Sequence, residues 1–248
     1  MELLVFLGGA FLVAFAVGAS GFADALIASA IWLHIYPAHE AVPLIYLCGA
    51  FVHALSLVAL GNALNPRRLA PFVLGGMCGT PLGVWALQVL DPEPIKRGVG
   101  AVLIVVASWQ LAGFARAHAR PSSERLHADS WPLRVADGGV GAVGGLLGGL
   151  AGLSGVLPTL WVGARGWTPS VQRGVYQPFI LLMHVWALCA LWVASALPDV
   201  VMERFLYCIP VLLAGLVFGQ SVYRRINQRV FRICVLALLC VSGVALVA

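Results

Sequence analysis

The sequence predicts an all-α polytopic membrane protein made of two inverted repeats of five helical segments each. Three observations support this fold class. Hydrophobic residues make up 61% of the chain and charged residues only 10%, whereas a soluble domain carries about 25% charged residues. Apolar stretches of helix length recur along the whole chain. Finally, a motif of the first half returns in the second half at a nearly constant spacing.

Ten apolar segments define the predicted helices. The hydrocarbon core of a bilayer, about 30 Å thick, requires about 20 apolar residues in a helix that rises 1.5 Å per residue. The apolar segments lie at 3–19, 21–36, 41–60, 69–90, 98–115, 138–153, 155–168, 174–197, 205–223 and 230–248. They divide the chain into an N-terminal transmembrane repeat at 1–115, a cytoplasmic linker at 116–137 and a C-terminal transmembrane repeat at 138–248.

The first two segments of each half are short, and the turns that join them carry almost no charge. Each pair could form two full spans joined by a tight turn. It could also form a re-entrant hairpin that returns to the side from which it entered. The uncharged turn favours the hairpin, because a turn exposed at the membrane surface usually recruits polar residues.

The basic residues sort to one side of the predicted bundle. Twelve of the fifteen Lys and Arg residues fall in loops that would share one side, whereas Lys96, Arg97 and Arg204 fall on the other. Short loops rich in Lys and Arg stay in the cytoplasm. The distribution therefore predicts a cytoplasmic linker and both termini outside the cytoplasm. We also expect the chain to lie in the inner membrane of a bacterial cell.

An internal duplication relates the two halves. Gly18-Ala19-Ser20-Gly21 matches Gly152-Leu153-Ser154-Gly155 at an offset of 134, Pro43 matches Pro178 at 135, and Gly79-x-x-x-Gly83 matches Gly215-x-x-x-Gly219 at 136. Offsets this uniform indicate a repeat. Five segments per half is an odd number, so the second copy would be inverted in the membrane. Many secondary transporters have this architecture and bind substrate near the midplane.

The two Gly-x-Ser-Gly stretches are the first candidate for a binding site. Glycine lets the backbone leave a helix, and the helix that follows begins with free N–H groups and a partial positive charge. Two such helix starts could converge on one anion, with Ser20 and Ser154 adding hydroxyl donors. The alternative is that the small residues only allow close helix packing. The duplication at matching positions favours the site.

Three further polar side chains could contribute to a site. Asp24 is the only acid inside a predicted apolar segment, where charges are costly and usually functional. It could carry a coupling proton, stabilise a cationic ligand or cap a broken helix. Arg173 could bind an oxyanion through two hydrogen bonds or extend to the membrane interface. Gln177 is either a contact between helices or a ligand donor, because an amide in an apolar stretch needs partners.

His53 and His184 lie in apolar segments of opposite halves. We expect both to be hydrogen-bonded core residues, the commoner role of a lone histidine in a membrane helix. A second candidate function is an intramembrane serine protease similar to the rhomboid family, with Ser154 as the nucleophile and His184 as its base. A single catalytic site gains nothing from an inverted copy of its motif, so this function ranks second.

Residues 148–161, Gly-Gly-Leu-Ala-Gly-Leu-Ser-Gly-Val-Leu-Pro-Thr-Leu-Trp, resemble the second-half signature of the TauE/SafE sulfite exporter family, also called the toluene sulfonate uptake permeases. Arg165-Gly166-Trp167, Gln172-Arg173 and Tyr176-Gln177-Pro178 also match that signature, and residues 21–26 look like its weaker first-half partner. The resemblance spans nearly the whole chain. It implies export or uptake of small sulfur-containing anions such as sulfite or organosulfonates.

These observations together predict a secondary transporter, not an enzyme, that binds a small sulfur-containing anion at the membrane midplane between the paired Gly-Ser breaks. The predicted substrate-binding residues, including Thr159 of the family signature, are Ser20, Gly21, Asp24, Ser154, Gly155, Thr159, Arg173 and Gln177. Its expected partners are the anion, the lipid bilayer and a coupling proton or cation. None of the six cysteines forms a Cys-x-x-Cys pair, so we expect no metal and no cofactor. We also expect no catalytic residues and no nucleic acid partner.

Overall fold

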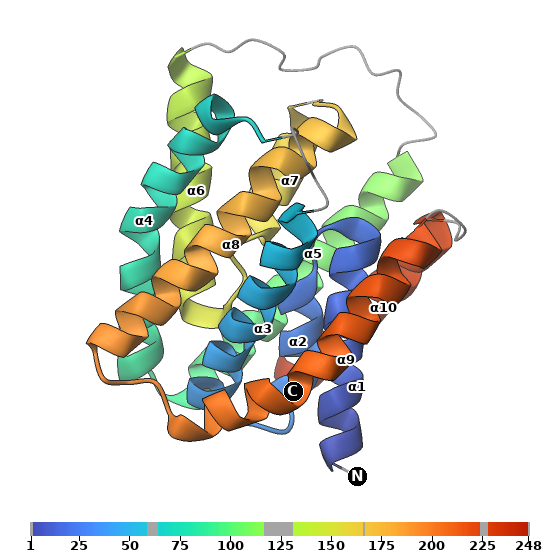
Figure 1. The fold of residues 1–248 in the computed structure, drawn as a ribbon. Helices are drawn as coiled ribbons and strands as arrows, with labels where there is room; N and C mark the ends of the chain where they lie inside the picture. Colours follow the sequence, from blue (N-terminus) through green and yellow to red (C-terminus); the bar gives the residue numbers. More distant parts are fainter. Residues whose placement is uncertain (1, 59–63, 117–130, 166, 224–227, 248) are drawn as a thin grey trace.

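A computed structural model describes residues 2–58, 64–116, 131–165, 167–223 and 228–247. These residues form ten α-helices and no strands (Figure 1). The helices are α1 (Glu2–Ser20), α2 (Asp24–Trp32), α3 (Ala38–Val58), α4 (Pro66–Val89), α5 (Pro92–Arg116), α6 (Trp131–Ala151), α7 (Val156–Ala164), α8 (Pro169–Val193), α9 (Asp199–Tyr223) and α10 (Gln228–Val247). Each predicted segment overlaps one helix, so the predicted all-helical fold is confirmed.

Five of the described helices, α1, α3, α4, α8 and α9, are long and apolar enough to cross a membrane. Figure 1 shows that the long helices run between two ends of the bundle. α1, α5 and α9 begin at the lower end of this view, whereas α4, α6 and α8 begin at the upper end. The N- and C-terminal marks both lie towards the lower end, and α5 ends at the upper end. α1 and α6 therefore begin at opposite ends of the bundle.

The first and second helices of each half form a hairpin with one long and one short limb. α1 has 19 residues and α6 has 21, whereas α2 and α7 have nine each. The first limbs are longer than the predicted segments, by two residues in α1 and mainly because α6 already begins at Trp131. A nine-residue helix is about 14 Å long, less than half the hydrocarbon thickness. Each short limb returns towards the end from which its hairpin entered (Figure 1).

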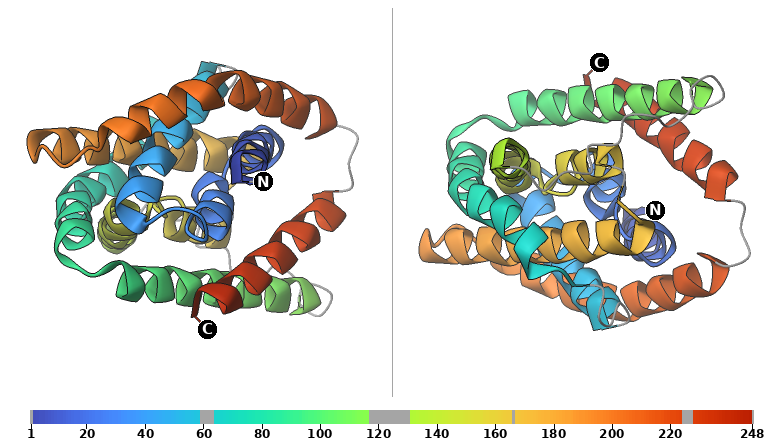
Figure 2. Two further views of the ribbon diagram at one scale, coloured as in Figure 1. Left: turned by 90° about the horizontal axis from the view of Figure 1, so that it is seen from below. Right: turned by 90° about the horizontal axis from the view of Figure 1, so that it is seen from above.

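The short limbs lie inside the bundle. Figure 2 shows α2 and α7 within a ring formed by α4, α5, α9 and α10. Eight of the nine residues of α2 are buried, from Asp24 at its start to Trp32 at its end. A helix that begins in the interior leaves its first N–H groups there without partners from its own turns. The two hairpins thus bring helix starts to the centre of the protein.

α6 begins at Trp131, inside the segment predicted to be the linker. Residues 131–137 form its first two turns, and residues 117–130 lie outside the described part of the chain. The hydropathy pattern detects only the apolar part of a helix and misses polar first turns. Pro132 suits the first turn of a helix, where its missing N–H costs nothing. Asp137 is only 3% exposed and belongs to the interior of the protein.

Helix pairing follows a reciprocal pattern. The first helix of each half packs along the fourth helix of the other, giving the pairs α1–α9 and α6–α4. The third helices, α3 and α8, cross each other, and the fifth helices, α5 and α10, pack together. This reciprocal pairing of equivalent helices is the arrangement that an inverted repeat would produce. The inverted repeat itself stays a prediction.

Glycines set the distance between α4 and α6. A Cβ atom at Gly79 would collide with the carbonyl oxygen of Ala142 and lie 2.9 Å from the backbone nitrogen of Leu146. Such contacts with backbone atoms cannot be relieved by rotating a side chain. A Cβ atom at Gly139 of α6 would meet nothing within 4 Å.

Gly79→Ala is expected to lower the free energy of unfolding by about 1–3 kcal/mol, because the two helices must separate. Gly139→Ala is the matched control and should be neutral or stabilising by up to about 1 kcal/mol, since alanine is the better helix former. Unfolding in mixed detergent micelles, followed by circular dichroism, measures both. Equal effects of the two variants would contradict the close packing of α4 on α6.

Candidate functional site

Both hairpins break at residues in the left-handed backbone conformation. In the first hairpin these are Gly21, with φ of 82°, and Ala23, with φ of 78°. In the second hairpin it is Gly152, with φ of 77°. The sequence alignment pairs Gly21 with Gly155, yet Gly155 has an ordinary right-handed φ of −78°. The two breaks therefore occupy different positions of the same motif, because α1 continues through Ser20 whereas α6 ends before Gly152.

One face of α8 holds the first break. Arg173 Nη2 donates to the carbonyl oxygen of Ala19 at 3.3 Å, the Tyr176 hydroxyl donates to that of Ser20 at 3.0 Å, and Gln177 Nε2 donates to that of Gly21 at 3.1 Å. Residues spaced three and four apart lie on one side of a helix. The last carbonyl groups of a helix lack partners within it. The side chains of α8 supply them, which fixes the end of α1 deep in the protein.

The second break is held in a similar way by α3 and α8. The Tyr46 hydroxyl of α3 donates to the carbonyl oxygen of Gly149 at 2.6 Å. His184 Nε2 of α8 lies 3.1 Å from the carbonyl oxygen of Gly152. A Cβ atom at Gly152 would lie 3.6 Å from Cβ of Ala25, which belongs to the first turn of α2. The two breaks therefore meet at the centre of the protein.

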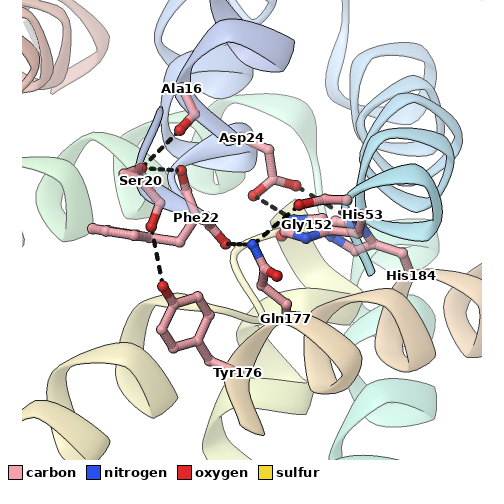
Figure 3. A network of polar contacts seen from close by, with 11 residues as sticks. Ala16, Ser20, Phe22, Asp24, His53, Gly152, Tyr176, Gln177 and His184 are labelled. Atoms are coloured by element: carbon pink, nitrogen blue, oxygen red, sulfur yellow. Dashed lines mark hydrogen bonds and ion pairs between the residues drawn. The ribbon is translucent and has the colours of Figure 1, made fainter. Parts of the chain in front are cut away.

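Asp24 and two histidines form a buried ionisable cluster where the breaks meet (Figure 3). Asp24 Oδ1 lies 3.3 Å from His53 Nε2, and Asp24 Oδ2 lies 3.9 Å from His184 Nδ1. Asp24 is 3% exposed and both histidines are 0% exposed. Gly49 provides the room, since a Cβ atom there would lie 2.7 Å from Asp24 Oδ2 and 2.5 Å from His184 Nδ1.

The two histidines were predicted to be core residues and not site residues. They are buried, but both face the Asp24 carboxylate. A usable signal was present in the repeat. Gly49 and His184 are 135 positions apart, the same offset as Pro43 and Pro178, so the duplication pairs the histidine with the glycine that it faces.

A second buried acid lies outside this cluster. Asp137 accepts a hydrogen bond from Trp161 Nε1 at 2.6 Å, and its Oδ2 lies 3.9 Å from Arg165 Nη2. Arg165 is 1% exposed, and its guanidinium also lies 5.1 Å from the centre of the Trp167 ring. The prediction singled out Asp24 as the only acid in an apolar segment. It missed Asp137, because α6 begins before the apolar segment predicted for it. Trp161 and Trp167 serve this cluster as packing and hydrogen-bonding residues.

The predicted serines differ in their surroundings. Ser20 Oγ lies 2.8 Å from the carbonyl oxygen of Ala16 and 2.9 Å from that of Phe22, so its hydroxyl is engaged within its own break. Ser154 is fully buried, and its hydroxyl makes no hydrogen bond to a described residue. The same holds for Thr159 Oγ1 and for Gln177 Oε1. The second break thus contains the hydroxyl groups that are available for a ligand.

The predicted site residues fall into two neighbouring groups. Gly21, Asp24, Arg173 and Gln177 surround the first break, and Ser154, Gly155 and Thr159 lie at and after the second. Within the described part of the chain, no three His, Cys, Asp or Glu side chains are placed to hold a metal ion.

The protease hypothesis is not supported. His184 directs Nε2 to the carbonyl oxygen of Gly152 and Nδ1 towards Asp24. Neither nitrogen is hydrogen-bonded to Ser154, whose hydroxyl makes no hydrogen bond to any described residue. The geometry of a serine nucleophile and its base is therefore not present.

The fold and the site define an integral, multi-pass membrane protein with two broken hairpins and a polar, ionisable centre. The family model described as "Sulfite exporter TauE/SafE" matches residues 6–246. The chain belongs to the TauE/SafE sulfite exporter family, as its signature residues suggested. No curated protein and no solved structure matches the chain.

Proposed function

We propose that the protein is a secondary transporter of small sulfur-containing anions, sulfite or organosulfonates, and that it binds the anion between the two helix breaks. One observation carries the proposal. Two hairpins enter the bundle from opposite ends, and their breaks meet among buried polar atoms that make no hydrogen bonds to described residues, including Ser154 Oγ, Thr159 Oγ1 and Gln177 Oε1. Membership of a family of sulfite exporters supports the choice of anion.

The chemistry of the breaks suits an oxyanion. α2 and α7 each begin at the centre, where a helix start carries about half a positive charge and unpaired N–H groups. The hydroxyl groups of Ser154 and Thr159 add donors beside the second start. The Arg173 guanidinium, which holds the end of α1, lies beside the first break. A sulfite or sulfonate group presents three oxygens that accept hydrogen bonds from such donors.

The predicted inverted repeat and the charge distribution support a transport cycle of alternating access. In transporters of this architecture, the two repeats move relative to each other around a central site and open it alternately to each side. We place the upper end of Figure 1 in the cytoplasm of a bacterial cell, because most of the basic residues lie in the loops of that end. Asp24 is the candidate carrier of a coupling proton or the partner of a coupling cation.

Ser154→Ala is expected to weaken binding of the anion about two- to tenfold, because it removes one neutral hydrogen bond worth about 0.5–1.5 kcal/mol. The experiment is a thermal-shift titration of the purified protein with sulfite, sulfoacetate, thiosulfate, sulfate and carboxylate analogues, since a specific ligand stabilises the folded state. Ser29→Ala is the matched control, because Ser29 Oγ is also buried without a hydrogen bond to a described residue but lies within α2. Equal affinities for both variants would argue against Ser154 as a ligand.

Arg173→Lys is expected to weaken binding of the anion about tenfold, although the substitution preserves the positive charge. A lysine ammonium cannot present two parallel N–H donors to an oxyanion, and it would have to abandon the carbonyl oxygen of Ala19 to reach it. The same titration measures the effect. Arg67→Lys, at an exposed position in the first turn of α4, is the control and should match the wild type. If Arg173→Lys binds the anion as tightly as the wild type, Arg173 only holds the end of α1 and does not bind the anion.

A further inference from the structure

Two buried polar atoms face each other across a narrow gap at the centre of the protein. Asp24 Oδ2 and His184 Nδ1 lie 3.9 Å apart, and neither makes a hydrogen bond to a described residue. Gly49 closes one side of the gap, with no side chain to fill it. The cluster appears in Figure 3, where Asp24 and His184 come from α2 and α8 and meet beside His53 of α3.

The second nitrogen of His184 determines what the gap can hold. Its Nε2 lies 3.1 Å from the carbonyl oxygen of Gly152, which can only accept a hydrogen bond. Nε2 therefore carries a hydrogen in every protonation state that keeps this contact. Nδ1 then has either a lone pair or a second hydrogen. A lone pair facing an ionised carboxylate is unfavourable in a buried site, so a proton on Nδ1 or on Asp24 Oδ2 stabilises the pair.

We propose that the gap between Asp24 Oδ2 and His184 Nδ1 is the binding site of a coupling proton that enters and leaves together with the anion. This inference rests on the proposed transport function. One added proton raises the charge of the cluster by one unit, whichever of the two atoms holds it. The cluster touches both breaks, through Asp24 at the start of α2 and through the hydrogen bond of His184 to Gly152.

Charge balance links the proton to the anion. Without the proton, the ionised Asp24 carboxylate repels an anion bound at the neighbouring helix starts. With the proton, that repulsion is removed, and a monovalent anion and a proton cross the apolar interior as a neutral pair. Uncompensated charge inside a membrane protein is costly. The two ligands must therefore raise each other's affinity by the same factor.

Few other ionisable groups face the gap. α3 contributes His53 and the Tyr46 hydroxyl, which donates to the carbonyl oxygen of Gly149. The turn between α6 and α7 contributes the Gly152 carbonyl, while Asp137 of α6 pairs with Arg165, which follows α7, and Arg134 of α6 is exposed. Arg173 of α8 lies at the end of α1, whose only ionisable side chain, Glu2, is at the opposite end of that helix. His53 holds the second carboxylate oxygen and leaves Oδ2 to the gap.

The first experiment measures coupling in liposomes that contain the whole protein. The probe is radiolabelled ethanesulfonate, a monovalent anion at every pH used, with the membrane potential clamped. Electroneutral cotransport of one proton with each anion predicts about tenfold accumulation for each pH unit of inward proton gradient, because one pH unit is a factor of ten in proton activity. His184→Gln should abolish this dependence on pH. Ethanesulfonate uptake that does not depend on the proton gradient would overturn the inference but leave the transport function intact.

A steric variant tests the gap itself. Gly49→Ala places a methyl group against both atoms and should lower gradient-driven uptake at least tenfold. Gly98→Ala of α5, where a Cβ atom would meet nothing within 4 Å, is the matched control and should transport as wild type. Normal gradient-driven uptake by Gly49→Ala would place the coupling proton elsewhere.

The second experiment does not depend on transport. Nitrogen-15 NMR of histidine-labelled protein, with His184→Gln to assign the signal, reports which ring nitrogens are protonated. We expect His184 Nε2 to stay protonated as the pH changes and Nδ1 to respond to the one proton that it shares with Asp24 Oδ2, with Asp24→Asn altering that step. A bare Nε2 would overturn the inference. If no tested anion is transported but this titration is found, the transport function fails and the proton site stands.

Discussion

Replacing Asp137 with asparagine is expected to lower the free energy of unfolding by about 3–5 kcal/mol, the usual cost of removing one partner of a buried ion pair. Asparagine still accepts the hydrogen bond of Trp161 Nε1, so the variant isolates the charge. The Arg165 guanidinium, 1% exposed, would then keep its charge in the interior without the carboxylate beside it. Denaturant unfolding in mixed micelles, followed by tryptophan fluorescence, measures the loss.

Two controls separate the pair from a general loss of negative charge. The double variant Asp137→Asn/Arg165→Met removes both charges and should recover most of the stability, because apolar groups of similar size often replace a buried ion pair without loss. Glu93→Gln removes an acid that is 69% exposed and 4.0 Å from Lys96, and no change is expected from it. A double variant whose loss is the sum of the two single losses would show that the two side chains do not interact.

Asp24→Asn is expected to lower transport of the anion at least tenfold while the protein still folds and inserts. Asparagine keeps the shape of the side chain but cannot carry the negative charge that faces His53 and His184. Tenfold is a lower bound, because it corresponds to about 1.4 kcal/mol and leaving a buried charge without its partner costs more than this. Initial rates of uptake into liposomes, at equal amounts of inserted protein, measure it.

The pH profile distinguishes a coupling role from a structural one. If Asp24 carries the coupling proton, the residual transport of Asp24→Asn should no longer increase with a proton gradient. If Asp24 only caps α2, the variant should transport more slowly with an unchanged pH profile. Asp91→Asn, at an exposed position between α4 and α5, serves as the control and should behave as wild type.

Hydropathy was sufficient to predict the ten helices, although not the polar first turns of α6. A bilayer allows few ways to satisfy backbone hydrogen bonds, so apolar stretches of the right length become helices almost regardless of detail. The Gly-x-Ser-Gly repeats likewise predicted the two breaks. The pattern did not reveal that Gly152, and not Gly155, takes the left-handed conformation. That choice depends on where α6 ends, which tertiary contacts such as the hydrogen bond from Tyr46 to Gly149 determine.

The ionisable clusters could be predicted only in part. Asp24 was identified because one acid stands out in an apolar segment. Its partners were not, because a contact between α2, α3 and α8 depends on how the helices cross and on the missing Cβ of Gly49. Asp137 was assigned to the linker, because the first turns of α6 look polar in the sequence. Arg165 was counted with the basic loop residues near the end of the predicted segment 155–168, and only the hairpin of α6 and α7 brings the two charges together.

The most direct test of the transport function is uptake of labelled sulfite by liposomes that contain the purified protein, at an alkaline pH where sulfite does not cross the bilayer as a neutral species. We expect saturable uptake that unlabelled sulfite or an organosulfonate inhibits. Ser154→Ala should weaken the affinity for sulfite, and Asp24→Asn should slow uptake at least tenfold. Folded, inserted protein that moves neither sulfite nor any of a panel of organosulfonates would contradict it.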